Sequence, residues 1–406
     1  MACFECMKAK LEKYGQQHLL RYYDELTEDQ KAALLAQIDD TDFSVVRVGK
    51  SDEVRGVITP IPCTELDEIN ARRDEYEAAG LEEIRAGKVG AVLLAGGMGT
   101  RLGSDGPKGV YNIGVTRDLY IFECLFRNLM DVTDKAGNPI HLFIMTSDKN
   151  HDATVSFLNE KNYFGYDGSF VHFFRQEMAP AADYNGKVYL EDKFRLSTSP
   201  NGNGGWYSSM AKGGMLDIVR KSGIEWLNVF AVDNVLQRIA DPVFIGATKL
   251  ANCVVGAKVI KKAAPDERVG VICLEDGHPS VVEYYELTDE MMNAKTEDGK
   301  PAYNFGVILN YLFRVPELSA IVDAKMPLHV VEKKIPCLDA DGNLFKPEKP
   351  NGYKYETLIL DMIHLLDSCL VFEVERKREF APIKNPTGID SVESARELLR
   401  LNGVEL

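Results

Sequence analysis

A glycine-rich stretch that follows an apolar segment contains the residues best suited to chemistry. Residues 89–94 read VGAVLL, and residues 95–103 read AGGMGTRLG. Glycines let backbone N–H groups approach phosphate oxygens closely, and a turn of this kind after a strand concentrates positive potential. Arg101 adds a full positive charge, as does Lys108 in the following Pro-Lys-Gly segment. The stretch therefore predicts a site for phosphate groups, in the first place those of a nucleotide.

Two other types of glycine loop fit this stretch poorly. A Walker A loop needs Gly-Lys followed by Ser or Thr, and that spacing does not occur here. The dinucleotide-binding fingerprint needs a third glycine where Leu102 stands, which disfavours an NAD-dependent oxidoreductase. A strand-to-helix turn without a ligand would explain the glycines. It would not explain Arg101 and Lys108 at this spacing.

The loop resembles the nucleotide loop of the nucleotidyltransferases that make sugar nucleotides. Within these it is similar to that of the eukaryotic-type UDP-N-acetylglucosamine pyrophosphorylases. Further segments resemble motifs of that family and follow in its order: 176–181 (QEMAPA), 199–205 (SPNGNGG), 232–234 (VDN), 281–284 (VVEY), 333–336 (KKIP), 349–352 (KPNG) and 382–385 (PIKN). One loop would be a moderately specific signal, whereas an ordered series is strongly specific.

The resemblance implies a reaction between UTP and N-acetylglucosamine 1-phosphate, or a related N-acetylhexosamine 1-phosphate, with release of pyrophosphate. The attacking phosphate oxygen is already negative, so catalysis consists of positioning and charge stabilisation without a general base. The sequence is in keeping with this, because it offers no Ser/His/Asp or Cys/His constellation.

Three basic residues match the family positions that contact phosphates. Arg101 is the candidate for the β- and γ-phosphates of UTP, Lys108 for the α-phosphate, and Lys384 for the sugar phosphate. The alternative for each is an ordinary solvated or ion-paired surface side chain.

Asp233 ends the apolar run 226–232 and is the candidate ligand for Mg²⁺, or else Mn²⁺, beside the phosphates. The alternative is an Asx turn or helix cap formed together with Asn234.

The remaining candidates would bind the uridine and the sugar. Backbone groups and one amide can read the edge of uracil. The matching positions are Leu94, Gly96, Gly97, Gln176, Pro200, Gly202 and Asn203. The positions that match the family's sugar-binding residues are Gly270, Glu283, Tyr284 and Val307. The family usually has Asn where Val307 stands, so the range of sugars is left open.

Composition narrows the class of protein. The 406 residues carry a net charge of −15, which argues against nucleic acid and anionic membranes as partners. We expect no membrane span, because there is no apolar run of about 18 residues, and no secretory signal. Eight scattered cysteines indicate reduced thiols. These observations predict a cytoplasmic protein, which we expect to be a monomer.

The element pattern predicts an α/β protein. From residue 89, apolar strands alternate with helical stretches, which favours a mixed, mostly parallel sheet flanked by helices in a Rossmann-like (GT-A-like) fold. The expected strands are 89–94, 141–146, 171–174, 226–232, 253–259, 269–274, 281–286 and 369–374, with helices at 65–86, 353–370 and 391–401. The first residues form a helical extension, in which Thr27 to Gln30 fit a capping box.

This pattern suggests three parts in chain order. Residues 1–88 form a helical arm, 89–385 a catalytic domain, and 386–406 a short C-terminal helix in place of the family's C-terminal lobe. Two readings remain open beside the main one. One is a UDP-sugar or UDP-glucose pyrophosphorylase on the same scaffold. The other is a nucleotide-sugar binding protein without turnover.

Overall fold

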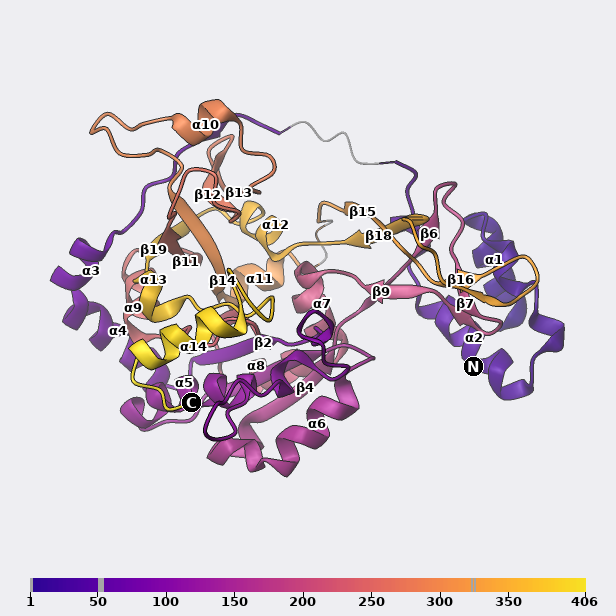
Figure 1. The fold of residues 1–406 in the computed structure, drawn as a ribbon, viewed down its shortest axis with the longest axis horizontal. Helices are drawn as coiled ribbons and strands as arrows, with labels where there is room; N and C mark the ends of the chain where they lie inside the picture. Colours follow the sequence, from indigo (N-terminus) through magenta and orange to yellow (C-terminus); the bar gives the residue numbers. More distant parts are fainter. Residues whose placement is uncertain (1–2, 50–54, 323, 325) are drawn as a thin grey trace. The chain divides into compact units, whose positions relative to one another are not determined.

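The computed structural model describes residues 3–49, 55–322, 324 and 326–406. They form two compact units, each built from three stretches of the chain (Figure 1). Unit 1 contains Glu177–Gly205 and the described residues of Met1–Val54 and Lys325–Ile359. Unit 2 contains the remaining stretches. These units follow spatial packing, and the domain boundaries at residues 88 and 385 stay a prediction.

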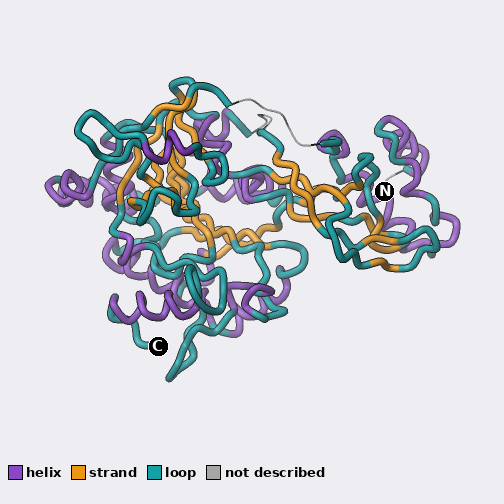
Figure 2. Tube along the Cα trace, turned by 45° about the horizontal axis from the view of Figure 1, so that its top comes forward, coloured by secondary structure: helices purple, strands orange, loops and turns teal. Residues whose placement is uncertain are grey.

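Unit 2 is organised around a mixed sheet, which Figure 2 shows between helices. Its strands are β1 (Ile58–Thr59), β2 (Val89–Leu94), β3 (His141–Thr146), β4 (Val171–Arg175), β10 (Trp226–Ala231), β11 (Val255–Lys261), β12 (Val271–Glu275), β13 (His278–Val282), β14 (Phe305–Arg314) and β19 (Cys369–Glu373). The order β10-β2-β3-β4 is parallel, as is the pair β11-β19. Strand β14 runs antiparallel to β10, β11 and β12, so the antiparallel share is larger than the strand–helix alternation predicts.

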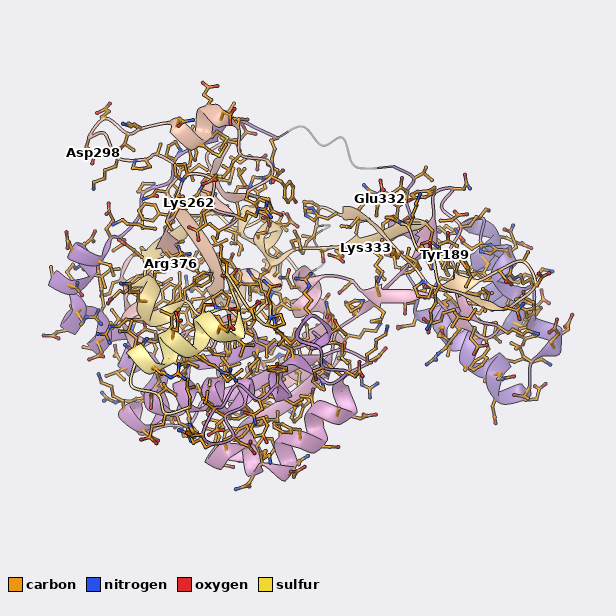
Figure 3. The ribbon with its side chains drawn as sticks, in the orientation of Figure 1. Tyr189, Lys262, Asp298, Glu332, Lys333 and Arg376 are labelled. Carbon is orange, nitrogen blue, oxygen red and sulfur yellow. The ribbon has the colours of Figure 1, made fainter. Side chains whose placement is uncertain are left out.

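Helices cover this sheet. They are α3 (Leu66–Ala71), α4 (Arg73–Arg85), α5 (Ile121–Ala136), α6 (His151–Glu160), α7 (Trp206–Lys212), α8 (Met215–Lys221), α9 (Pro242–Leu250), α10 (Asp289–Asn293), α11 (Val315–Ala320), α13 (Arg376–Glu379) and α14 (Val392–Leu401). Helix α12 (Ile359–His364) begins at the last residue of unit 1. Arg376 fixes α13 by donating to a Glu267 oxygen at 3.1 Å and to Lys261 O at 3.3 Å (Figure 3).

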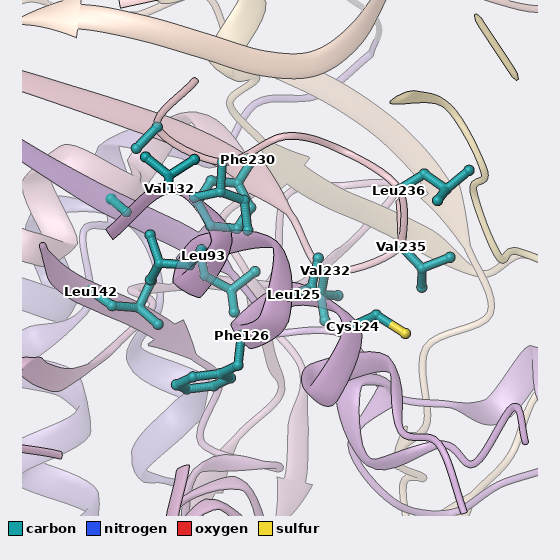
Figure 4. Packing of buried hydrophobic residues seen from close by; sticks show 14 of the residues in the cluster. Leu93, Cys124, Leu125, Phe126, Val132, Leu142, Phe230, Val232, Val235 and Leu236 are labelled. Carbon is teal, nitrogen blue, oxygen red and sulfur yellow. The ribbon is translucent and has the colours of Figure 1, made fainter. Parts of the chain in front are cut away.

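The hydrophobic core of unit 2 lies between the parallel strands and α5 (Figure 4). Every residue of β2 is buried, as expected for a parallel strand with both faces covered. Leu93 and Phe230 are at most 1% exposed, as is Phe126 of α5. This packing fixes the ends of β2 and β10, which are the two strands that lead into the predicted phosphate site.

Most of the predicted elements are confirmed. Strands 89–94 and 141–146 have the predicted bounds, and the Thr27 capping box with Gln30 is present. The strand expected at 281–286 is wrong in position, because β13 ends at Val282. The helix expected at 353–370 is also wrong. Its first part is strand β18 (Gly352–Glu356), and only α12 follows before β19.

Unit 1 combines N-terminal helices with short strands. The helices are α1 (Phe4–Lys13) and α2 (Glu28–Asp40), and the strands are β5 (Met178–Pro180), β6 (Ala182–Asp183), β7 (Leu190–Asp192), β8 (Arg195–Leu196), β9 (Thr198–Pro200), β15 (His329–Lys333), β16 (Cys337–Leu338), β17 (Leu344–Phe345) and β18. The helices share a core with Val188, Leu196 and Tyr355. Tyr189 donates to Asn351 O at 2.7 Å and links two of the three stretches (Figure 3). Among the described residues, no helix has the length and apolar character that crossing a bilayer requires.

Candidate active site

The glycine-rich loop leaves the carboxyl end of β2, where ligands bind in open α/β sheets. Gly96 is required by close packing, because a Cβ at this position would lie 2.8 Å from Gln176 Oε1. Gln176 is 7% exposed and directly follows β4. Two of the predicted uridine contacts therefore lie side by side. Gly97 is open, with no atom within 4 Å of a Cβ built there.

The loop closes on itself and so places Lys108 near its start. Gly99 N donates to Gly106 O at 2.9 Å, and Lys108 N donates to Gly97 O at 3.1 Å. Arg101 lies on the exposed side of this closed loop. The backbone around Gly97 and the two basic side chains thus belong to one compact turn.

Lys108, Asp233 and Lys384 come together although they are far apart in the sequence. Lys108 Nζ lies 3.8 Å from Asp233 Oδ2, and both side chains are largely buried. Burial lowers the pKa of Lys108, and the charges of Lys384 and Arg101 lower it further, against the opposing effect of Asp233. Three cations and one carboxylate therefore lie near one another, with Lys108 the most buried of them and Arg101 exposed. Such an arrangement is suited to several phosphate groups.

The core positions Asp233 and Lys384 relative to each other. Val232 and Val235 are buried on either side of the Asp233 turn, in the cluster of Figure 4. Asp233 O accepts from Ile383 N at 2.9 Å, so the residue next to Lys384 is tied to the end of β10. A single carboxylate beside a phosphate site matches the chemistry of Mg²⁺, which takes one or two carboxylates and completes its shell with phosphate oxygens and water.

The predicted sugar residues are brought together in part. A Cβ on Gly270 would lie 3.5 Å from both Glu283 Oε2 and Val307 Cγ2, and Val307 N donates to Gly270 O at 2.9 Å. Gly270, Glu283 and Val307 therefore line one spot. Tyr284 instead is 43% exposed, and its ring packs edge-on against Tyr285.

Pro200, Gly202 and Asn203 belong to unit 1 and are described within it. Pro200 ends β9, which pairs with β5 of the QEMAPA segment. Gly202 has a φ of +86°, and a Cβ there would lie 2.1 Å from Thr357 O, so the turn requires glycine. Asn203 Oδ1 accepts from Ile359 N at 3.0 Å at the start of α12. This amide thus has a structural bond in addition to the predicted contact with the ligand.

Two asparagines support the site, of which sequence reasoning missed Asn150 and gave Asn234 only as part of a possible Asx turn or helix cap. Asn150 is fully buried, and its Nδ2 donates to Ala95 O at 2.9 Å and to Gly97 O at 3.2 Å, which holds the glycine loop. Asn234 donates to Glu379 O at 2.7 Å and accepts from Ala381 N at 2.9 Å. Asn234 lies in the 232–234 motif, and its Oδ1 also accepts from Leu236 N at 3.3 Å, as in the Asx turn that the sequence offered as an alternative. Nothing local marks Asn150.

The comparison with family models identifies the chain's relatives. Residues 56–400 match the model described as UTP–glucose-1-phosphate uridylyltransferase. This matched range includes every element that carries the candidate phosphate-site residues. The chain belongs to this family. Family membership agrees with the resemblance seen in the motifs between residues 95 and 385.

Curated relatives and a solved structure cover almost the whole chain. The human UDP-N-acetylhexosamine pyrophosphorylase-like protein 1 is 36% identical over 98% of this chain and 84% of its own length. The Saccharomyces cerevisiae UDP-N-acetylglucosamine pyrophosphorylase is 34% identical, with coverage of 95% and 84%. The crystal structure of the Trypanosoma brucei uridine diphosphate N-acetylglucosamine pyrophosphorylase, in complex with an inhibitor, is similar to this fold. Its TM-score is 0.80 at 26% identity, with coverage of 97% and 84%.

Proposed function

We propose that this protein is a nucleotidyltransferase that joins N-acetylglucosamine 1-phosphate to UTP and releases UDP-N-acetylglucosamine and pyrophosphate. The convergence of Arg101, Lys108 and Lys384 around Asp233 carries the proposal. It occurs in a chain that is 33–36% identical to relatives named for N-acetylhexosamine or N-acetylglucosamine.

The reaction is an in-line displacement at the α-phosphorus of UTP. An oxygen of the sugar phosphate forms a bond to this phosphorus, and the bond to the β-phosphate oxygen breaks as pyrophosphate leaves. Lys108 stabilises the charge on the α-phosphate, Arg101 that on the leaving pyrophosphate, and Lys384 binds the sugar phosphate. Lys108 acts from a partly buried position, where its charge is stronger than in bulk water.

Asp233 would hold Mg²⁺, or Mn²⁺ in its place, beside the triphosphate. The ion would supply charge neutralisation to the phosphate oxygens. We expect no pyrophosphate release in excess EDTA, and at least a hundredfold lower kcat in Asp233→Asn, about the loss of one preorganised charge contact. A readout apart from turnover is the protection of UTP-bound protein against unfolding by Mg²⁺, which Asp233→Asn should lose. Undiminished turnover in EDTA would overturn the metal assignment.

One observation favours a second candidate, a broader UDP-sugar pyrophosphorylase. Val307 lies beside Gly270 and Glu283, where an apolar side chain offers no hydrogen bond to an acetamido group. The family model itself is described by glucose 1-phosphate.

One assay separates these functions. Pyrophosphate release is measured with UTP or ATP and with N-acetylglucosamine, N-acetylgalactosamine or glucose 1-phosphate. We expect UTP to be required and the N-acetylated sugars to give the highest kcat/KM. Turnover with glucose 1-phosphate alone would favour the second candidate. Binding of UDP-sugar without turnover would identify a nucleotide-sugar binding protein.

A further inference from the structure

A tight turn folds back onto Lys384. The turn runs from residue 385 to residue 391, between Lys384 and α14. Asp390 O accepts from Lys384 N at 2.6 Å and from Asn385 N at 3.1 Å. Asp390 has a φ of +52° and Gly388 a φ of +84°, so two left-handed residues close the turn. The backbone thus places residue 390 directly beside residue 384.

The Asp390 side chain faces the ammonium group of Lys384. Asp390 Oδ2 lies 3.1 Å from Lys384 Nζ, with side-chain exposures of 29% and 43%. Lys108 faces Asp233 in a similar way at 3.8 Å. Each of the two lysines at the phosphate site therefore has its own carboxylate. The two cations also lie near each other, because Lys384 is one of the groups that lower the pKa of Lys108.

Helix α14 connects this turn to the segment that follows Lys108. Ser391 caps α14 through a bond from Ser394 N, so the N-cap of the helix directly follows Asp390. Arg396 in α14 donates to Ile113 O at 2.8 Å and to Gly114 O at 3.0 Å. The turn is therefore anchored to the chain that carries Lys108, and it fixes where the Lys384 backbone lies relative to that residue.

We propose that Asp390 is a positioning residue that acts through Lys384 and holds its ammonium group ready for the sugar 1-phosphate. The inference rests on the proposed function. A lysine side chain loses much conformational freedom when it is ordered, and ordering it before the ligand arrives reduces this cost of binding. An ammonium group has three donors, so Lys384 can keep Asp390 while it donates to a phosphate. Removal of the carboxylate should therefore weaken sugar-phosphate binding.

The test is Asp390→Asn. Asparagine tolerates the left-handed backbone, and the two bonds to the backbone oxygen of residue 390 remain, so the fold is preserved. We expect the KM for N-acetylglucosamine 1-phosphate to rise about three- to fivefold, the range of a half-exposed ion pair. The KM for UTP should change less than twofold. The matched control is Asp276→Asn in the β12–β13 turn, where φ is +51°, and neither KM should change.

A second pair of variants separates positioning from a structural role. In the Lys384→Ala background, adding Asp390→Asn should leave the KM for the sugar phosphate unchanged, because no ammonium group remains to be held. An equal rise in both backgrounds, or no rise with Lys384 present, overturns the inference. Calorimetric binding of N-acetylglucosamine 1-phosphate carries the same expectation without turnover. A wild-type protein that binds this ligand but releases no pyrophosphate refutes the proposed function and leaves this test intact.

Discussion

The proposed phosphate site brings positive charges together around Lys108, where burial makes a cation costly. Lys108 is largely buried, and its pKa is lowered by that burial and by two neighbouring cations. A bound phosphate would supply the negative charge that Asp233 at 3.8 Å only partly supplies. The residue therefore reduces the stability of the ligand-free protein in favour of ligand binding. Such trade-offs are common where function needs a strained arrangement of charge.

Removal of the Lys108 charge should therefore lower activity without lowering stability. Lys108→Met should lower kcat/KM about a hundredfold, the effect of losing one preorganised charge contact, yet it should not lower Tm. Because the folded-state pKa is depressed, the wild type gains stability as pH rises through that value toward 10.5. The stability difference between variant and wild type should shrink over the same range, measured by urea unfolding at several pH values. A variant that is both active and less stable would contradict the phosphate assignment.

The side chain at position 307 should influence which sugar 1-phosphate the enzyme prefers. Valine can neither donate nor accept a hydrogen bond, whereas asparagine can do both. Val307→Asn should raise the preference for N-acetylglucosamine over glucose 1-phosphate about two- to tenfold, the worth of one net hydrogen bond. The measurement is kcat/KM for both sugars in the wild type and in the variant. An unchanged ratio would mean that residue 307 does not contact the sugar.

Strands that appear as apolar runs in the sequence could be predicted, whereas strands that depend on distant pairing partners could not. The buried apolar runs 89–94 and 141–146 are visible in the sequence, because both faces of a parallel strand are covered. Residues 352–356 have no such run. They form β18 because β15 and β6 pair with them, and β6 lies about 170 residues earlier. A helix was predicted there since only local pattern was available.

The joint between the 233–235 turn and residues 379–383 is the element that aligns Asp233 with Lys384. Asn234→Ala would leave Glu379 O and Ala381 N without their buried partner. We expect a loss of about 2–4 kcal/mol in the free energy of unfolding, because Glu379 O loses its donor and Ala381 N and Leu236 N lose their acceptor. Asn293→Ala is the control, because its one bond is to Asp289 O on the exposed surface of α10. Equal stability of the two variants in urea unfolding would mean that the joint contributes little.

Over the whole chain, the sequence marks the candidate site residues more clearly than the residues that support them. Arg101, Lys108, Asp233 and Lys384 stand in motifs, and the structure brings them together. Asn150 and Asp390 have no motif, and their roles depend on which loops meet after folding. The same limit applies to the units. Each unit draws on three separate stretches, and no local pattern in the sequence shows which stretches pack together.

A buried charge cluster joins β11 to the segment that follows Asp233 and to the segment that precedes Lys384. Lys258 is fully buried, and its Nζ lies 3.0 Å from Asp241 Oδ2 and 2.5 Å from Glu379 Oε2. Burial opposes ionisation of Asp241, yet Lys258 and Arg238 hold its pKa below the ordinary value. Burial raises the pKa of Glu379, and Lys258 offsets this only in part. One cation thus serves two carboxyl groups, of which Glu379 is the one that tends to keep its proton.

Two substitutions in this cluster should have unequal effects. Lys258→Met leaves two buried carboxyl groups without their cation, and we expect a loss of about 3–5 kcal/mol in the free energy of unfolding at pH 7. Glu379→Gln keeps the Lys258–Asp241 pair and should cost far less.

Because the folded-state pKa of Glu379 is raised, the wild type loses stability as pH rises above the ordinary carboxyl value of 4.5. Glu379→Gln removes that loss, so its stability relative to the wild type should improve between pH 5 and pH 7.5, at about the conditions where buried carboxyl groups titrate. Urea unfolding at both pH values measures this, and a constant difference would show that Glu379 is ionised throughout.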